Sequence, residues 1–518
     1  MIAAPRLVAP RTHLGVLVEP AAPRLHAALR TAGAGAGPAL LNTPCAVLRE
    51  RLRGRFELRA PVVLTGHQAE FFHAGVLAKT FAAHALARAV GGTAVFLTVD
   101  SDQPKTAQLP VPQVTPGGLR RVAVAIPGVE PRQSFEFQPP VAREHWLQFF
   151  TQAAGLLPHY RESLLRPLAE AWLDGPDPLG YCDAWDRGRT AVEQVLGLDG
   201  VRTLRVSALA ATPEFRCFAA ALVLDSAAVA AHYNAAQAAY RARHRVRTPG
   251  RPVPPLLVDG TLREVPLWVV RAGVGRRRLF VRDGGDIVEL WADRTSLGQM
   301  ARAALASAAA QVAPWPLEAE GWGLRPRALT LSGFARLLLA DLFIHGIGGA
   351  RYDEITEEFL RRWLGATPAP LACVSATLLL PLPHAEALAA ALRAARHASR
   401  DLRWNPQRHV AGLPEELVRQ RAELARRSDD LRRHEPHDHE TRRLVYQALH
   451  RINETLLAHD PWRAAEYDQR VAELELAAEQ DRIAGDREYF YGLHTTAAVA
   501  ELGARLRAAL EPVAERET

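Results

Sequence analysis

The sequence predicts an α/β protein with a parallel-sheet core, inserted segments and a C-terminal α-helical coiled-coil hairpin. Two apolar strands, APVVLTG (60–66) and TAVFLTVD (93–100), flank an apolar helix at 74–90, which is typical of a parallel sheet covered on both faces. Short strands over 263–291 predict a small antiparallel insertion. Strands are then absent from 415–482, where charge density rises. These patterns together favour one α/β core followed by a helical region.

Three regions follow from these patterns. We expect an N-terminal lead-in at 1–58 and a core at 59–400, with the β insertion at about 245–295. The last region, 401–518, should hold the helical coiled coil and a C-terminal docking segment.

The remaining elements follow the same signals in chain order. A short helix is expected at 23–31 and Pro-punctuated extended chain at 105–138. Further strands are expected at 201–209 and 371–380. Further helices are expected at 141–175, 213–243, 331–344, 354–365 and 384–398. Because a parallel βαβ crossover is almost always right-handed, the loops after the first two strands should meet at the carboxyl edge of the sheet.

The coiled-coil prediction rests on leucine spacing. Leu417, Leu424 and Leu431 recur at heptad intervals, which is the spacing of a packed helical seam. Pro436 and Pro461 interrupt the pattern, so long antiparallel helices forming a hairpin are expected. A coiled coil that forms a homodimer is the alternative.

Lysine is almost absent from the chain. Lys79 and Lys105 are the two lysines among 63 basic residues. This bias is typical of a GC-rich genome, but arginine cannot replace lysine where a compact or titratable amine is needed. Both lysines are therefore candidate functional residues, with chance survival as the alternative. The net charge of +7 comes without arginine clusters that alternate with aromatic residues, so no nucleic-acid partner is expected.

Metal, membrane and disulfide chemistry are not expected. The four cysteines are scattered without a CxxC pair, which favours a reducing, cytoplasmic location. HEPHDHE (434–440) offers three histidines but lies at a break between charged helices, so we predict a solvated tip and no metal. The N-terminus lacks an apolar signal segment, and LLLADLFI (337–344) is too short to cross a bilayer.

The first candidate site is TGHQAEFFHAG, where a buried strand ends and a helix begins. Such turns present backbone N–H groups and a positive helix end to anionic ligands. The candidate residues here are Thr65, Gly66, His67, Gln68, His73 and Gly75. No G-x-G-x-x-G or Walker A pattern is present, so the usual dinucleotide and P-loop interpretations lack support. A buried turn with hydrogen-bonded histidines is the alternative.

The second candidate site is VDSDQPK, after the next strand. Asp100, Asp102 and Lys105 should lie beside the first loop, where carboxylates can orient an amine or hydroxyl or take a proton. A capped turn closed by Pro104 is the alternative.

The third candidate site is HGIGGARYDE, between two predicted helices. Its candidate binding residues are His345, Gly346, Gly348, Gly349, Arg351 and Tyr352. Repeated glycines allow close backbone approach to a ligand, although a tight helix–helix connection is the alternative. Upstream, Arg325 and Arg327 could clamp a carboxylate or phosphate.

The first motif resembles one in the bacillithiol-biosynthesis cysteine-adding enzymes (the BshC family). TGHQAEFFHAGVLAKTFAAHALA is similar to their TGQQxGLFxGPLxTxxKAxxAI, and the resemblance takes Lys79 as the counterpart of the motif's lysine. The matching positions are Thr65, Gly66, Gln68, Phe72, Gly75, Leu77, Lys79 and Ala82. TAVFLTVDSD resembles the family's PVFWIASEDHD, with Asp102 at the first aspartate, and Gly348 and Gly349 match the glycine pair of AYVGGPGEIAY.

The resemblance implies a Rossmann-like core, a helical coiled coil and a carboxylate–amine ligase activity. In that family cysteine is joined to the amine of a glucosamine–malate conjugate. The chain departs from the motif at His67, and its EDHD signature is reduced to Asp100, Ser101 and Asp102. The substrate is therefore expected to differ.

We expect a small-molecule ligase with His67, His73, Lys79 and Asp102 as catalytic residues. A requirement for ATP or ADP is left open. The alternative function is a non-catalytic binding or scaffold protein that acts through its coiled coil.

Overall fold

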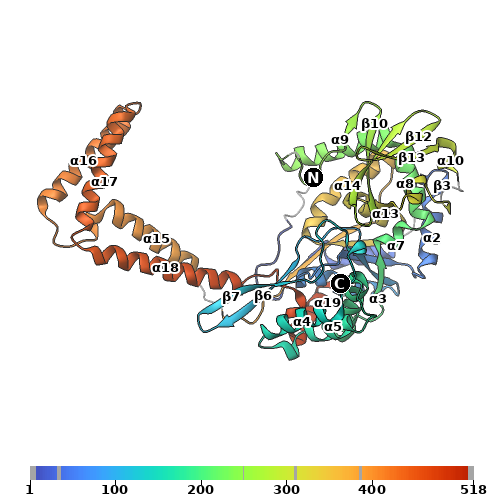
Figure 1. Ribbon diagram of the computed structural model, residues 1–518, viewed down its shortest axis with the longest axis horizontal. Coiled ribbons are helices and arrows are strands. Elements are labelled where there is room, and N and C mark those ends of the chain that lie inside the picture. Colours follow the sequence, from blue (N-terminus) through green and yellow to red (C-terminus); the bar gives the residue numbers. More distant parts are fainter. Residues whose placement is uncertain (1–6, 32–36, 249, 308–311, 384–387, 512–518) are drawn as a thin grey trace, which may run out of the picture. The chain divides into compact units, whose positions relative to one another are not determined.

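The chain forms two compact units in a computed structural model that describes residues 7–31, 37–248, 250–307, 312–383 and 388–511 (Figure 1). Unit 1 comprises Met1–Gln113, Val122–Leu379 and Arg487–Thr518. Unit 2 comprises Val114–Arg121 and Leu380–Asp486. The helical region thus begins earlier than the expected boundary at residue 401, and the chain returns to unit 1 after Asp486.

Unit 1 is built on a six-stranded sheet in the order β1-β16-β15-β4-β5-β8. Its strands are β1 (Gly15–Glu19), β4 (Val62–Gln68), β5 (Thr93–Val99), β8 (Arg202–Arg205), β15 (Leu342–His345) and β16 (Leu371–Thr377). The last five run parallel, as predicted, and β1 pairs antiparallel with β16. The N-terminal region is therefore more than a lead-in, because its GVLVE segment completes the sheet edge.

Two predicted elements end earlier than expected. The apolar run over 331–344 divides into helix α13 (Ala328–Leu338) and strand β15. Asp341 marks the break, because its carboxylate accepts a hydrogen bond from Val62 N at 2.7 Å and pairs with Arg53. The strand expected at 201–209 stops at Arg205, and the short helix α7 (Val206–Ala210) follows. A buried apolar run does not by itself distinguish helix from strand.

Helices cover both faces of the sheet (Figure 1). Helix α3 (Ala74–Ala89) links β4 to β5 and packs against α19 (Thr496–Leu510). Helix α14 (Ile347–Leu364) links β15 to β16 and packs on α9 and α13. Gly365 ends α14 in the left-handed conformation, which glycine adopts without strain. The other described α-helices of this unit are α1 (Ala22–Arg30), α2 (Cys45–Arg55), α4 (Arg143–Gly155), α5 (Leu165–Leu173), α6 (Tyr181–Val195), α8 (Pro213–Leu224), α9 (Ser226–His244), α10 (Arg302–Ala306) and α12 (Pro316–Ala319).

The predicted β insertion is an antiparallel sheet in the order β13-β12-β11-β10-β14. Its strands are β10 (Leu262–Arg271), β11 (Gly275–Asp283), β12 (Ile287–Ala292), β13 (Thr295–Ala301) and β14 (Gly323–Pro326), with β9 (Val258–Asp259) beside β10. It extends beyond the expected end near residue 295, because β14 pairs with β10. Its apolar face, including Val265 and Leu279, shares one core with Phe218 of α8 and Phe334 of α13. This packing fixes the inserted sheet beside the parallel one.

Unit 2 is helical apart from the tip of the hairpin formed by β6 (Gln108–Thr115) and β7 (Gly118–Ala125). Its helices are α15 (Leu388–Trp404), α16 (Glu415–His434), α17 (His439–Leu457) and α18 (Pro461–Ala484). Helix α15 packs along α18, and α16 packs along α17. Leu431 and Leu456 are fully buried, so the leucine pattern marks the helix contacts.

No single helix among the described residues has the length and apolar composition to cross a membrane. Among the described helices one pair, α8 and α9 taken together, meets those criteria, and the two are bent by 88° with respect to each other.

Candidate functional site

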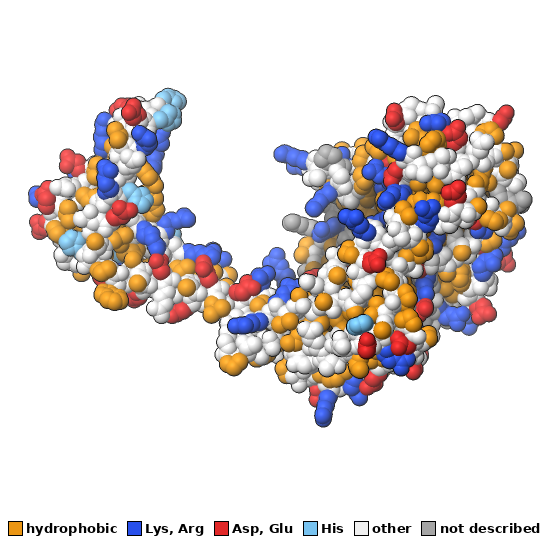
Figure 2. Space-filling view, in the orientation of Figure 1, with side chains coloured by type: hydrophobic (Ala, Val, Ile, Leu, Met, Phe, Trp, Pro, Cys, Tyr) orange, Lys and Arg blue, Asp and Glu red, His pale blue; other side chains and the backbone are white. Residues whose placement is uncertain are grey.

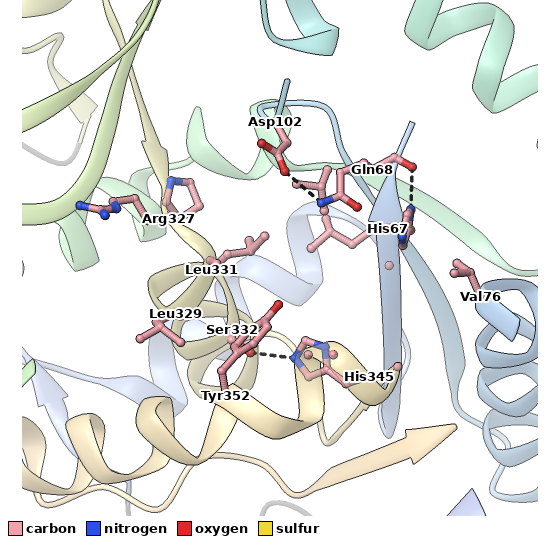
Figure 3. Close-up of a pocket in the computed structure, with 18 of the residues that line it drawn as sticks. His67, Gln68, Val76, Asp102, Arg327, Leu329, Leu331, Ser332, His345 and Tyr352 are labelled. Carbon is pink, nitrogen blue, oxygen red and sulfur yellow. Dashed lines mark hydrogen bonds between the residues drawn. The ribbon is translucent and has the colours of Figure 1, made fainter. Parts of the chain in front are cut away.

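A cavity of about 650 Å³ lies at the carboxyl ends of β4, β5 and β15 (Figure 3). The chain proceeds from β4 toward β5 and β8, but from β15 it proceeds the opposite way, to β16. The strand order therefore reverses between β4 and β15. In open α/β sheets this reversal point, outside the carboxyl ends of the strands, is where ligands bind. The cavity volume also lies within the range of small-molecule sites.

The β4 and β5 ends bring a glutamine and an aspartate together. Gln68 Nε2 donates a hydrogen bond to Asp102 Oδ2 at 2.9 Å, and the two side chains point toward each other in Figure 3. Arg276 of the inserted sheet donates to Asp102 Oδ1 at 2.5 Å. Burial tends to raise the pKa of Asp102, but these hydrogen bonds and the charge of Arg276 outweigh it and hold the pKa below its usual value. Asp102 is thus a fixed carboxylate, and it is the one acidic side chain among the described residues that line the cavity.

Lys79 reaches the cavity from the interior of α3. Its side chain is buried, and Nζ donates to the backbone oxygen of Gly66 at 2.5 Å. A structural role in which Lys79 pairs with Asp100 or Asp102, the alternative to a role in the site, is wrong, because it pairs with neither. Burial lowers the pKa of Lys79 to about 7.

His73 caps the N-terminus of α3. Its Nδ1 accepts a hydrogen bond from Gly75 N at 3.0 Å, and its Nε2 faces Glu488 Oε2 at 3.3 Å. Burial and the charges of Arg487 and Lys79 lower its pKa to about 3. The ring is therefore neutral, with the proton on Nε2 directed at Glu488. His67 is neutral as well, because burial and then Lys79 hold its pKa well below the usual value.

The HGIGG turn forms the wall opposite β4. Gly346 caps α14 without a side-chain hydrogen bond, and the first turn of this helix lines the cavity. Its N–H groups and positive dipole end favour an anion. His345 Nε2 lies 3.1 Å from Ser332 Oγ, a contact drawn in Figure 3. A Cβ on Gly349 would lie 2.3 Å from His345 Nδ1, so the absence of a side chain there makes room for the imidazole.

The inserted sheet supplies a cationic and aromatic wall. Trp268 lines the cavity, and the guanidinium carbons of Arg276 and Arg327 lie 4.9 Å and 4.6 Å from its ring centroid. Arg327 also pairs with buried Glu264. The predicted partner of Arg327, Arg325, instead pairs with Glu136 at 2.5 Å. Arg325 and Arg327 therefore do not form the predicted two-arginine clamp.

Most predicted site residues line one cavity, but three do not. Thr65 is buried and donates to Ile344 O at 3.0 Å, which ties β4 to β15. Asp100 is buried and accepts a hydrogen bond from Ser207 N at 2.9 Å. Arg351 donates to Leu7 O at 2.6 Å. These three residues stabilise the fold around the site, whereas Lys105 lies at the cavity edge and pairs with Glu70 at 3.2 Å.

Residues that are distant in sequence complete the site. Arg487 donates to Ala376 O at 2.7 Å, and a Cβ on Gly75 would lie 2.4 Å from its Nη2. The other residues missed by sequence reasoning are Tyr233, Trp268, Arg276, Ser332 and Ser375. No local motif surrounds any of them, and only tertiary packing brings them to the β4 edge.

The histidine-rich segment at 434–440 lies at the tip where α16 meets α17, where Figure 2 shows pale-blue side chains gathered at the surface. His434, His437 and His439 are exposed. In the part of the chain that the structure describes, no three or more His, Cys, Asp or Glu side chains are placed so that they could hold a metal ion together.

No protein-family model matches this chain, and no curated protein sequence matches it significantly.

Proposed function

We propose that the cavity is the active site of an enzyme that joins a small carboxylic acid to an amine. The observation that supports it best is the separation of charge around one space. Asp102 presents a fixed carboxylate on one side, and α14 presents its free N-terminus on the other. A carboxylate orients an ammonium or amino group, and a helix N-terminus holds an acid or a phosphate.

The proposed roles follow from these positions. Asp102 would hold the amine, with Gln68 and Arg276 fixing its orientation. The backbone of Gly348 and Gly349 would hold the acid. The neutral imidazole of His67 is available to accept the proton that the amine loses when the C–N bond forms. Activation of the acid by ATP or ADP belongs to the proposal, since the same helix N-terminus suits phosphate oxygens.

The resemblance to the bacillithiol cysteine-adding enzymes supports this proposal through Thr65, Gly66, Gln68 and the position of Asp102. It does not assign a role to Lys79. Counted residue by residue from Thr65, the lysine of the family motif falls opposite Phe81. The function of Lys79 must therefore be argued from its surroundings. A Rossmann-like classification of the parallel sheet is part of the same proposal.

Thermal-shift measurements test the proposed site. Adenine nucleotides, cysteine and amino-sugar conjugates would be screened against the wild type, Asp102→Asn and Arg351→Ala. A ligand at 100 times its dissociation constant stabilises the native state by about 2.7 kcal/mol and raises its melting temperature. We expect an amine ligand to shift the wild type and the Arg351→Ala control, which lies outside the cavity lining, but not Asp102→Asn. Equal shifts in all three proteins, or none in any, would contradict the assignment.

A second function, assembly through a coiled coil in unit 2, is supported by its exposed apolar side chains. Trp462 is 81% exposed, and Leu444, Tyr446 and Leu476 are also exposed. Association of two copies through the face of α18 that carries Trp462 would bury that side chain. Sedimentation equilibrium of the wild type and Trp462→Ser tests this, with a dimer expected only for the wild type. A monomeric wild type would contradict it.

A further inference from the structure

Lys79 differs from an ordinary buried lysine in its surroundings. Only 4% of its surface is exposed, and its described polar partner is the Gly66 carbonyl oxygen at 2.5 Å. Within the described part of the chain no carboxylate pairs with its ammonium group. Buried lysines are rare unless they are paired with an acid. Lys79 is therefore unusual, because no described carboxylate offsets the charge of its buried amine.

Burial disfavours the charged form of Lys79 and is the cause of its lowered pKa. His67, His73 and His345 lie close enough for the charge of Lys79 to lower their pKa values, and as neutral rings they do not offset that charge as a carboxylate would. Among the described residues, the thiol of Cys373 acts in the opposite direction and raises the pKa of Lys79, while burial raises the pKa of Cys373 itself to about 11. With its pKa lowered to about 7, much of the Lys79 amine is unprotonated at neutral pH. A desolvated amine of this kind is the form in which lysine acts as a nucleophile.

Lys105 provides an internal contrast. Its side chain is 63% exposed, and its ammonium group pairs with Glu70 at 3.2 Å. Both lysines line the same cavity, yet only Lys79 combines burial with the lack of an acidic partner. A carbonyl compound entering the cavity therefore meets one buried amine without an acidic partner and one exposed amine that pairs with Glu70.

We propose that Lys79 forms an imine with a small carbonyl compound that carries a carboxylate or phosphate group. The anionic group lies at the N-terminus of α14 and the carbonyl carbon lies at Lys79 Nζ. The nitrogen lone pair adds to the carbonyl carbon, and the two amine hydrogens leave with the carbonyl oxygen as water, so the step needs no oxidant or reductant. The inference requires the cavity to bind an anionic small molecule, but it does not require ligation.

Trapping with a reducing agent tests the proposal. The wild type would be incubated with glyoxylate and sodium cyanoborohydride near neutral pH, because the hydride converts an imine to a stable secondary amine. Peptide mapping by mass spectrometry then measures modification at each lysine separately. We expect Lys79 to be modified at least about tenfold faster than Lys105, because burial lowers the pKa of Lys79 to about 7, whereas Lys105 is held in an ion pair with Glu70. Modification of Lys105 at an equal or greater rate would overturn the proposal.

Two variants and one pH series complete the design. Lys105→Arg should retain the fast modification, and Lys79→Arg should lose it while circular dichroism confirms that it is folded. The rate at Lys79 should rise with pH around a midpoint near 7, the lowered pKa of its amine. A midpoint like that of an exposed lysine would also overturn the proposal. Ligand-induced thermal shifts that survive a failed trapping experiment would leave the ligase function standing and remove only the imine.

Discussion

The helices of unit 2 and the carboxyl edge of the unit 1 sheet differ in how they use charge. In unit 2, pairs such as Arg403–Asp468 and Arg482–Glu479 are exposed on both sides, and Figure 2 shows blue and red side chains interspersed along these helices. At the sheet edge, Lys79 is buried and Arg487 is half-buried, and neither has a buried acid as a partner among the described residues. The exposed pairs keep the helical surface solvated and contribute little to the free energy of unfolding. Cations at a cavity without a buried acid as partner support the proposed site for an anionic ligand.

The largest expected effect comes from a third arrangement, a charge in unit 1 that is buried and fully paired. Arg336 is 1% exposed, pairs with Asp353 and donates to Ala369 O at 2.7 Å. Arg336→Ala leaves the buried Asp353 carboxylate without its partner, so we expect a loss of about 3–5 kcal/mol in unfolding free energy. Urea denaturation measures it.

Glu357→Gln is the matched control, because this outer partner of Arg336 is half exposed. We expect it to change stability by less than about 1 kcal/mol. Equal losses of unfolding free energy for Arg336→Ala and Glu357→Gln would mean that burial does not determine how much a paired charge contributes to stability.

A smaller effect, with a distinctive pH dependence, is expected at Lys79. Its pKa is lowered from 10.5 in the unfolded chain to about 7 in the native state. Between these values the unfolded state binds more protons, so stability rises with pH from about 7 upward and is lowest below 7. The gain in unfolding free energy across this pH range should be on the order of a few kcal/mol. His73 and His345 stay neutral throughout this range, because their pKa values lie at about 3 and about 4.

Lys79→Met isolates this contribution. The variant should lack the rise and should be more stable than the wild type below pH 7. Urea denaturation of both proteins across the neutral and mildly alkaline range measures the difference. Parallel pH profiles for the two proteins would show that the Lys79 amine is charged and paired in the native state.

The glycine turn of α14 offers a prediction of intermediate size with its own control. At Gly349 a Cβ would lie 2.3 Å from His345 Nδ1, whereas at Gly348 no atom lies within 4 Å. Gly349→Ala should displace His345 from Ser332 and lose about 1–3 kcal/mol. Gly348→Ala should be neutral or gain up to about 1 kcal/mol, since alanine favours a helix. Thermal denaturation distinguishes them, and equal behaviour would mean that His345 is not held by this turn.

Much of the parallel sheet and one side of the site could be predicted from sequence. Strands β4 and β5 are continuous apolar runs bounded by glycine and aspartate, so both their existence and the polar loop after β4 follow from local pattern. Strand β15 could not be predicted, because LFIH continues the apolar run of helix α13 without a change in composition. The turn residues His345 and Gly349 were still found, since glycines mark close backbone approach.

The other wall of the site could not be predicted in this way. Arg276 lies in a strand whose neighbours are also arginines, in the segment GRRRLFVRD. Nothing local distinguishes the arginine that meets Asp102 from those beside it. The same holds for Thr65, in strand β4, and Asp100, just after β5, which direct their side chains at the backbone of neighbouring elements. Pattern therefore locates the site, and tertiary packing decides which side chains enter it.

The smallest expected effect concerns the exposed pairs of unit 2. Arg403 and Asp468 are each about half exposed, and their closest atoms are 2.7 Å apart. Arg403→Ala should lower the unfolding free energy by at most about 1 kcal/mol, because solvent screens the attraction and both side chains lose rotamer freedom to make it. The difference from the wild type should shrink further in molar salt, where the Debye length falls to about 3 Å. Urea denaturation at low and high salt measures both effects. A loss as large as that of Arg336→Ala, unchanged by salt, would mean that unit 2 depends on its charges for stability. The contrast between unit 2 and the sheet edge would then no longer support the proposed ligand site at Lys79 and Arg487.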